Sequence, residues 1–137
     1  MFGQSGRDWE RSAELKLVHS YNIVKTHLQL GYDVVLPFLL TKPEQAEAYE
    51  ALAHECGAIF YEFYLDLPHE EASERLLERG CWGELGSAPL TAADMPRIEA
   101  LYQKLMAATA HREHAIRLYP QLGNIAETYQ ELLKQLG

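Results

Sequence analysis

The chain has 137 residues, a net charge of −8 and ordinary proportions of apolar and charged residues. That length predicts one domain, whose core needs neither disulfides nor metal. The acidic balance argues against a basic surface for DNA or RNA, although a few local arginines can still hold a phosphate. No apolar run is long enough for a membrane span or a secretory signal. Cys56 and Cys81 form no C-x-x-C pair, which favours a reduced, cytoplasmic setting and leaves one disulfide open.

Apolar periodicity predicts the elements of the first half of the chain. From Asp8 onward, apolar residues recur every three or four positions, which predicts a helix that ends at Gly31. Residues 32–40 are continuous, apolar and partly β-branched, as in a strand buried on both faces, and Pro37 limits its ladder. A second helix opens around Pro43 and stops near Gly57. The inward residues of the first helix are predicted to be Trp9, Ala13, Leu15, Leu17, Val18, Tyr21, Val24 and Leu28.

The second half continues the alternation of strands and helices. Residues 58–65 predict a second strand, and Pro68 opens a third helix that ends at Gly80. Residues 81–90 carry two glycines and a proline and predict a mobile loop. Asp94 is the expected N-cap of a fourth helix. A third strand is predicted over residues 115–119, and a last helix follows the loop at 120–124.

This order predicts a single α/β domain over residues 1–137, in which a short parallel sheet is covered by helices in three layers. The simplest interpretation is an α/β domain without an assigned role. Two histidines three positions apart, His111 and His114, lack a third ligand nearby, so we expect surface histidines and no metal site. The aromatic residues at 61, 63 and 64 are expected to pack in the core.

The succession of motifs resembles the small-molecule kinases of the P-loop class, such as gluconate kinases, chloramphenicol phosphotransferases and zeta-toxin-like kinases. A glycine and an apolar strand at 31–36 precede a helix, a strand that ends in leucine and proline at 65–68, and the sequence Arg75-Leu-Leu-Glu-Arg79. In those families a helix with an R-L-x-x-R pattern leads into a mobile lid, here residues 81–90. The resemblance covers nearly the whole chain and implies ATP, magnesium and a small hydroxyl-bearing acceptor.

The resemblance also implies roles for individual residues. Arg75 and Arg79 would approach the transferred phosphate as the lid closes. The alternative is two surface arginines paired with Glu71, Glu74 or Glu78, where each pair contributes little.

Two further positions have implied roles and simpler alternatives. Arg7 and Asp8 would meet the acceptor substrate, whereas the alternative places them at a helix N-terminus where Asp8 favours the dipole. Gly123 and Asn124 would border the adenine, whereas a turn followed by an asparagine N-cap explains them equally.

The sequence departs from the family at its phosphate-binding loop. No G-x-x-x-x-G-K-[ST] motif occurs, and the strand at 32–40 ends without the carboxylate that would help hold magnesium. The chain as given is therefore expected not to hydrolyse ATP appreciably.

Three interpretations follow from this departure. The chain is a fragment whose upstream reading frame encodes the loop, or a non-catalytic module that binds itself or a partner, or an unrelated α/β protein. The missing central strand would leave apolar strand edges unpaired, so we expect a homodimer or a larger assembly.

Overall fold

The computed structural model describes residues 3–81 and 88–137, with side chains from residue 14 onward within those ranges. The protein is mixed α/β, rich in helix, with one short parallel sheet of two strands. Its elements are α1 (Gly3–Gln29), α2 (Pro43–Glu55), β1 (Phe63–Leu65), α3 (His69–Arg79), the 3₁₀ turn η1 (Ala92–Asp94), α4 (Met95–Ala110), β2 (Ile116–Leu118) and α5 (Ile125–Gln135). None of the described helices has an apolar stretch long enough to cross a bilayer.

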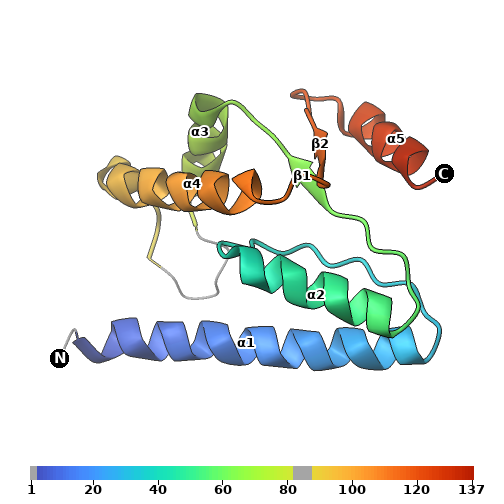
Figure 1. Cartoon of the computed structure of the whole chain (residues 1–137). Helices are drawn as coiled ribbons and strands as arrows, with labels where there is room; N and C mark the ends of the chain where they lie inside the picture. The colour runs from blue at the N-terminus through green and yellow to red at the C-terminus, as the bar shows by residue number, and fades with distance from the viewer. Residues whose placement is uncertain (1–2, 82–87) are drawn as a thin grey trace. The chain divides into compact units, whose positions relative to one another are not determined.

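The chain divides into two compact units. One consists of Met1–Leu39 and Glu44–Phe60, and the other of Leu40–Pro43 and Tyr61–Gly137. The first unit therefore holds α1 and nearly all of α2, and the second holds the sheet with α3, α4 and α5 (Figure 1).

The first unit is held together by the packing of α1 against α2. Val24 of α1 and Tyr49 and Leu52 of α2 form its core, and Leu52 is completely buried. The rings of Tyr21 and Tyr49 lie 5.9 Å apart. Burial, followed by the neighbouring Tyr21, raises the pKa of Tyr49. The other buried residues of α2 are Ala46 and Ala53.

The predicted face of α1 is confirmed only in part. Leu17, Tyr21, Val24 and Leu28 are buried or half-buried, whereas Leu15 and Val18 are more than half exposed. A helix packed against one neighbour buries a single stripe, and these two residues lie outside it. The helix ends, as predicted, where Gly31 adopts a positive φ of 82°.

The strand predicted over residues 32–40 is wrong. That segment has no regular secondary structure, although it keeps the alternation of a strand. Val34 and Leu36 pack against the core of the first unit, while Val35 between them is 91% exposed. A strand also needs a neighbour for its backbone groups, and the only pairing in the described sheet is between β1 and β2. The strand predicted at 58–65 is likewise reduced to Phe63–Leu65.

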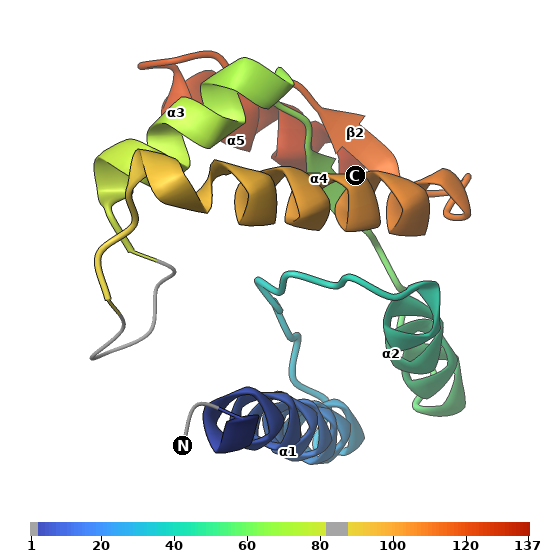
Figure 2. The ribbon, with the colours of Figure 1, turned by 90° about the vertical axis from the view of Figure 1, so that its left-hand side faces the viewer.

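The second unit is built around the parallel pair of β1 and β2, in which Tyr64 lies opposite Arg117. Helices α3 and α4 lie on one side of the pair and α5 on the other (Figures 1 and 2). The strand predicted near residues 115–119 is thus confirmed as Ile116–Leu118. Parallel strands require a long crossover, which α3, η1 and α4 supply.

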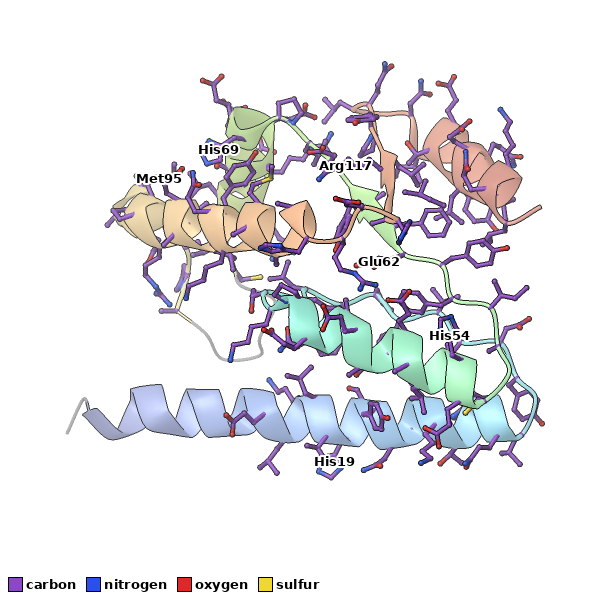
Figure 3. The ribbon with its side chains drawn as sticks, viewed as in Figure 1. His19, His54, Glu62, His69, Met95 and Arg117 are labelled. Atoms are coloured by element: carbon purple, nitrogen blue, oxygen red, sulfur yellow. The ribbon has the colours of Figure 1, made fainter. Side chains whose placement is uncertain are left out.

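Helices α3 and α4 are joined by a side-chain contact at the start of α3. The Nε2 atom of His69 lies 2.6 Å from a carboxylate oxygen of Glu99, and its imidazole meets the ring of Tyr102 edge-on at 4.3 Å. Figure 3 shows His69 beside α4.

Asp94 precedes α4 as predicted but does not cap that helix with its side chain. Its carboxylate instead accepts a hydrogen bond from the backbone N–H of Thr91 at 3.0 Å, because a 3₁₀ turn comes before α4. Most of the predicted loop at 81–90, residues 82–87, lies outside the described residues.

Candidate functional site

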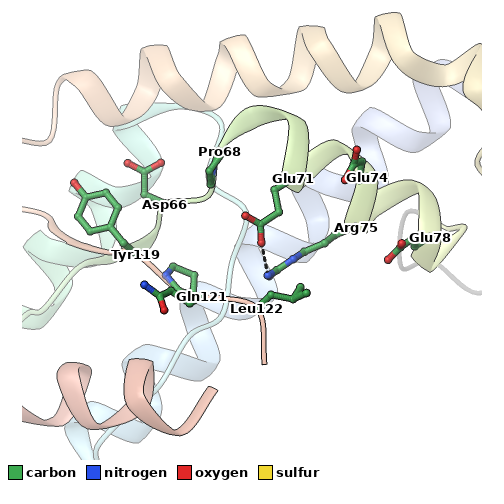
Figure 4. A pocket seen from close by; sticks show the side chains of 10 residues that line it. Asp66, Pro68, Glu71, Glu74, Arg75, Glu78, Tyr119, Gln121 and Leu122 are labelled. Atoms are coloured by element: carbon green, nitrogen blue, oxygen red, sulfur yellow. Dashed lines mark hydrogen bonds and ion pairs between the residues drawn. The ribbon is translucent and has the colours of Figure 1, made fainter. Parts of the chain in front are cut away.

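A cleft of about 550 Å³ lies in the second unit where the two strands end (Figure 4). One wall follows β1 and continues along α3, and the other follows β2. The cleft is lined by Asp66, Pro68, Glu71, Glu74, Arg75, Glu78, Tyr119, Pro120, Gln121 and Leu122.

The parallel pairing explains why residues from two distant segments meet here. Parallel strands have their carboxyl ends at the same edge of a sheet, and ligands of α/β proteins commonly bind beyond that edge. Asp66 follows β1 directly, and Tyr119 follows β2 directly. Hydrogen bonds from Ile116 N to Glu62 O at 2.8 Å and from Asp66 N to Leu118 O at 2.7 Å extend the ladder at both ends.

The charge of this cleft is predominantly negative. Four carboxylate residues and one arginine line it. Asp66 is balanced by Arg117, whose guanidinium lies 3.0 Å from its carboxylate, and Glu71 is bonded to Arg75. The cleft therefore favours a cationic or hydroxyl-bearing ligand over an isolated anion.

Arg75 is the sequence-predicted residue that faces this cleft. Its guanidinium donates to the carboxylate of Glu71 at 2.5 Å, one helical turn earlier (Figure 4). The Nε atom of Arg75 is buried and has no hydrogen-bond partner among the described residues. The pairing with Glu71 that the sequence offered as the simpler alternative is thus present, and it leaves the guanidinium about one-third exposed.

Arg79 does not line the cleft. It lies in the last turn of α3, where its Nε donates to the backbone carbonyl of Cys81 at 3.1 Å. Gly80 closes the helix with a φ of 71°. The two arginines that the resemblance groups together therefore have different surroundings.

Gly123 and Asn124 come directly after Leu122 in the sequence, but they do not line the cleft. Gly123 has a φ of 79°, which favours glycine. Asn124 occupies the N-cap position of α5, but its side-chain amide donates to Glu127 at 2.7 Å and makes no cap hydrogen bond.

Arg7 and Asp8 belong to the first unit, within α1, and their side chains lie outside the described residues. The expectation that Asp8 begins the helix is wrong, because α1 begins at Gly3. Asp8 therefore lies beyond the first turn, where the favourable interaction with the helix dipole declines.

A buried polar cluster at the start of β1 was not predicted. Glu62 accepts a hydrogen bond from the hydroxyl of Tyr64 at 2.5 Å and another from Arg112 Nε at 2.8 Å. The side chains of Glu62 and Arg112 are each only 12% exposed. Burial, followed by the hydrogen bond to Glu62, raises the pKa of Tyr64 well above its ordinary value. Figure 3 places Glu62 beneath the strand pair and Arg117 at it.

The described residues include no group of three His, Cys, Asp or Glu side chains that could hold a metal ion. Both cysteines are free and half-buried.

The edge of β1 that has no hydrogen-bonded neighbour among the described residues is a second candidate site. In a parallel ladder, alternate residues of a strand direct their backbone groups to the same neighbour. Glu62 and Asp66 bond to β2, so the backbone groups of Phe63 and Leu65 point towards the opposite edge. The side chain of Leu65 is 64% exposed, and the rings of Tyr61 and Phe63 stack at 6.3 Å on the same face.

An exposed apolar segment follows α1 in the other unit. Its exposed large side chains are those of Leu30, Tyr32, Val35, Phe38 and Leu39. Within the described part of the chain, the backbone of residues 33–36 makes no hydrogen bond. Such a segment has both the apolar surface and the unpaired backbone groups of a strand that lacks its neighbour.

In comparisons with known proteins, no family model, curated protein or solved structure matches this chain.

Proposed function

We propose that this chain is a binding module that associates with a second copy of itself and carries out no phosphate transfer on its own. The observation that carries the proposal is the exposed apolar segment at residues 30–39, whose backbone is unpaired at 33–36. Scattered exposed apolar residues are ordinary on protein surfaces. Several of them in one short segment that also has unpaired backbone groups are characteristic of an interaction surface.

The expected strength of this association follows from the area available. Full burial of a Val or Leu side chain contributes about 1.5–3 kcal/mol, and each copy offers several such side chains. The loss of translational and rotational freedom costs about 4–15 kcal/mol. We therefore expect a concentration-dependent dimer, for which a micromolar dissociation constant would correspond to a net free energy of about −8 kcal/mol.

Light scattering coupled to size-exclusion chromatography tests the proposal over a dilution series. We expect the mass to rise from that of one chain towards that of two as the concentration passes through the micromolar range. A constant mass of one chain over the whole series would contradict self-association.

A relationship to small-molecule kinases is a second candidate, favoured by the position of Arg75 at the carboxyl ends of two parallel strands. In this proposal the sheet and helices belong to a three-layer kinase-like fold, and the cleft is what remains of a site for a nucleotide or an acceptor. The four carboxylates of the cleft and the missing G-x-x-x-x-G-K-[ST] motif argue against phosphate transfer by this chain.

Calorimetric titration with ATP and magnesium separates the two candidates. Binding at micromolar strength that Arg75→Ala weakens at least about tenfold would support the kinase relationship. The same loss in Lys134→Ala, a substitution on α5 outside the cleft, would show that the effect is one of overall charge. If the chain is a binding module without a nucleotide site, neither the wild-type protein nor the two variants should show heat of binding.

A further inference from the structure

We infer that residues 32–36 of a second copy add as a third strand to the free edge of β1, and that the exchange is reciprocal. The inference rests on the proposed self-association and names its contact. In the described part of one copy, the edge of β1 has no neighbouring strand and residues 32–36 have no strand to pair with. The inference brings these two features together.

The edge of β1 supplies the backbone groups. Phe63 and Leu65 direct their N–H and C=O groups away from β2, as the alternation of the parallel ladder requires. Among the described residues, the sheet has two strands of three residues each. A pair of that size is marginal in water, and a third strand would stabilise it. An extended segment that joins a sheet edge gains main-chain hydrogen bonds and sets its specificity through alternate side chains.

Residues 32–36 supply the matching strand. Val34 and Leu36 turn inward and Val35 turns outward, which is the period of two that a strand requires. Their N–H and C=O groups are unpaired in the described part of the chain. The next residue, Pro37, lacks an N–H, so the added strand would end there.

The side chains of the two segments are compatible. Tyr61, Phe63 and Leu65 share one face of β1 and are apolar. Val35 of the incoming segment would lie beside that face, where contacts between aromatic and β-branched residues stabilise neighbouring strands. Because each copy has one edge and one segment, a twofold dimer would satisfy both at once.

Helix α5 provides the matched control. Its Ile125 is 84% exposed, close to the 91% of Val35, but it is the first residue of a helix and belongs to neither of the two segments proposed to pair. We therefore compare Val35→Lys with Ile125→Lys by light scattering over the same dilution series. Val35→Lys should raise the dissociation constant of the dimer at least about tenfold. Ile125→Lys should leave it within about threefold.

The outcomes distinguish this inference from the proposed function. Loss of the dimer in Ile125→Lys alone would place the interface on α5 and overturn the inference, while self-association would stand. A wild-type protein that stays monomeric would overturn both. Circular dichroism and urea unfolding of each variant establish that the fold is intact, which is expected because both side chains are exposed.

A cysteine experiment does not depend on how the lysine variants fold. In a Cys56→Ser, Cys81→Ser background, Val35→Cys protein is mixed with Leu65→Cys protein under mild oxidation. Neighbouring residues on paired strands lie within reach of a disulfide. We expect a mixed disulfide dimer to form faster than in a mixture of Ile125→Cys and Leu65→Cys proteins. Equal rates in the two mixtures would overturn the inference.

Discussion

Glu62 is the residue whose contacts most clearly hold the second unit together. Its carboxylate accepts hydrogen bonds from Tyr64 and from Arg112, two residues far apart in sequence. Both members of the Glu62–Arg112 pair are largely buried. Loss of one partner from such a pair is costly, because the remaining charge keeps its desolvation penalty.

Glu62→Ala should therefore lower the free energy of unfolding by roughly 3 kcal/mol in urea denaturation. The matched control is Lys134→Ala, which removes an exposed ion pair with Glu131. That substitution should cost less than about 1 kcal/mol. Equal effects of the two substitutions would show that burial of the Glu62 pair contributes nothing.

Tyr64 makes the free energy of unfolding fall as the pH rises into the alkaline range. Its pKa is raised in the folded state by burial and by the hydrogen bond to Glu62. The unfolded chain ionises this tyrosine at its ordinary pKa near 10, so above that pH the folded state binds more protons than the unfolded state. The resulting stability is present below pH 10 and is lost as the pH rises above it. Tyr64→Phe should show a flatter decline in unfolding free energy above about pH 10 than wild type. Parallel curves for the two proteins would contradict the assignment.

At the residue scale, the sequence predicted some site residues and missed others for a physical reason. Arg75 was predicted through the resemblance to small-molecule kinases, and it lines the cleft at the strand ends. The pairing of Glu62 with Arg112 spans fifty positions, and no local pattern indicates such a contact. It depends on the register of β1 against β2, which only the tertiary structure fixes.

At the scale of elements, the helices were predictable because their apolar spacing is local. The positions of α2, α3 and α4 follow from buried faces repeated at three and four residues, and from glycine at the ends of α2 and α3. The prediction of a strand at 32–40 was wrong because a strand forms only where a neighbouring strand pairs with its backbone groups. Its sequence has the right alternation, but the described chain offers it no neighbouring strand.

The packing of α1 on α2 should depend strongly on Leu52. This side chain is completely buried between the helices of the first unit. Leu52→Ala should cost about 2–5 kcal/mol of unfolding free energy, because it removes buried methyl groups and leaves a cavity. Ile23→Ala, at a side chain of α1 that is 59% exposed and lies outside the apolar segment, should cost far less in the same chemical denaturation. A small effect of Leu52→Ala would contradict the assignment of this core.

On the scale of the whole molecule, each of the two units has backbone groups that lack a pairing partner among the described residues. The first has exposed apolar residues in a segment whose backbone is unpaired at 33–36, and the second has a strand edge, at Phe63 and Leu65, without a hydrogen-bonded neighbour among the described residues. Native proteins usually cover or charge such edges to avoid association. Here the exposed residues along both segments are mainly apolar, which is consistent with an interface between copies.

Hydrogen exchange measured at two protein concentrations tests this association most directly. Alternate backbone amides within residues 33–36, and those of Phe63 and Leu65, should exchange more slowly at high concentration, because strand addition gives them hydrogen-bond partners. Amides of α5 should exchange at the same rate at both concentrations. Exchange of residues 33–36, Phe63 and Leu65 that does not change with concentration would contradict strand addition between copies.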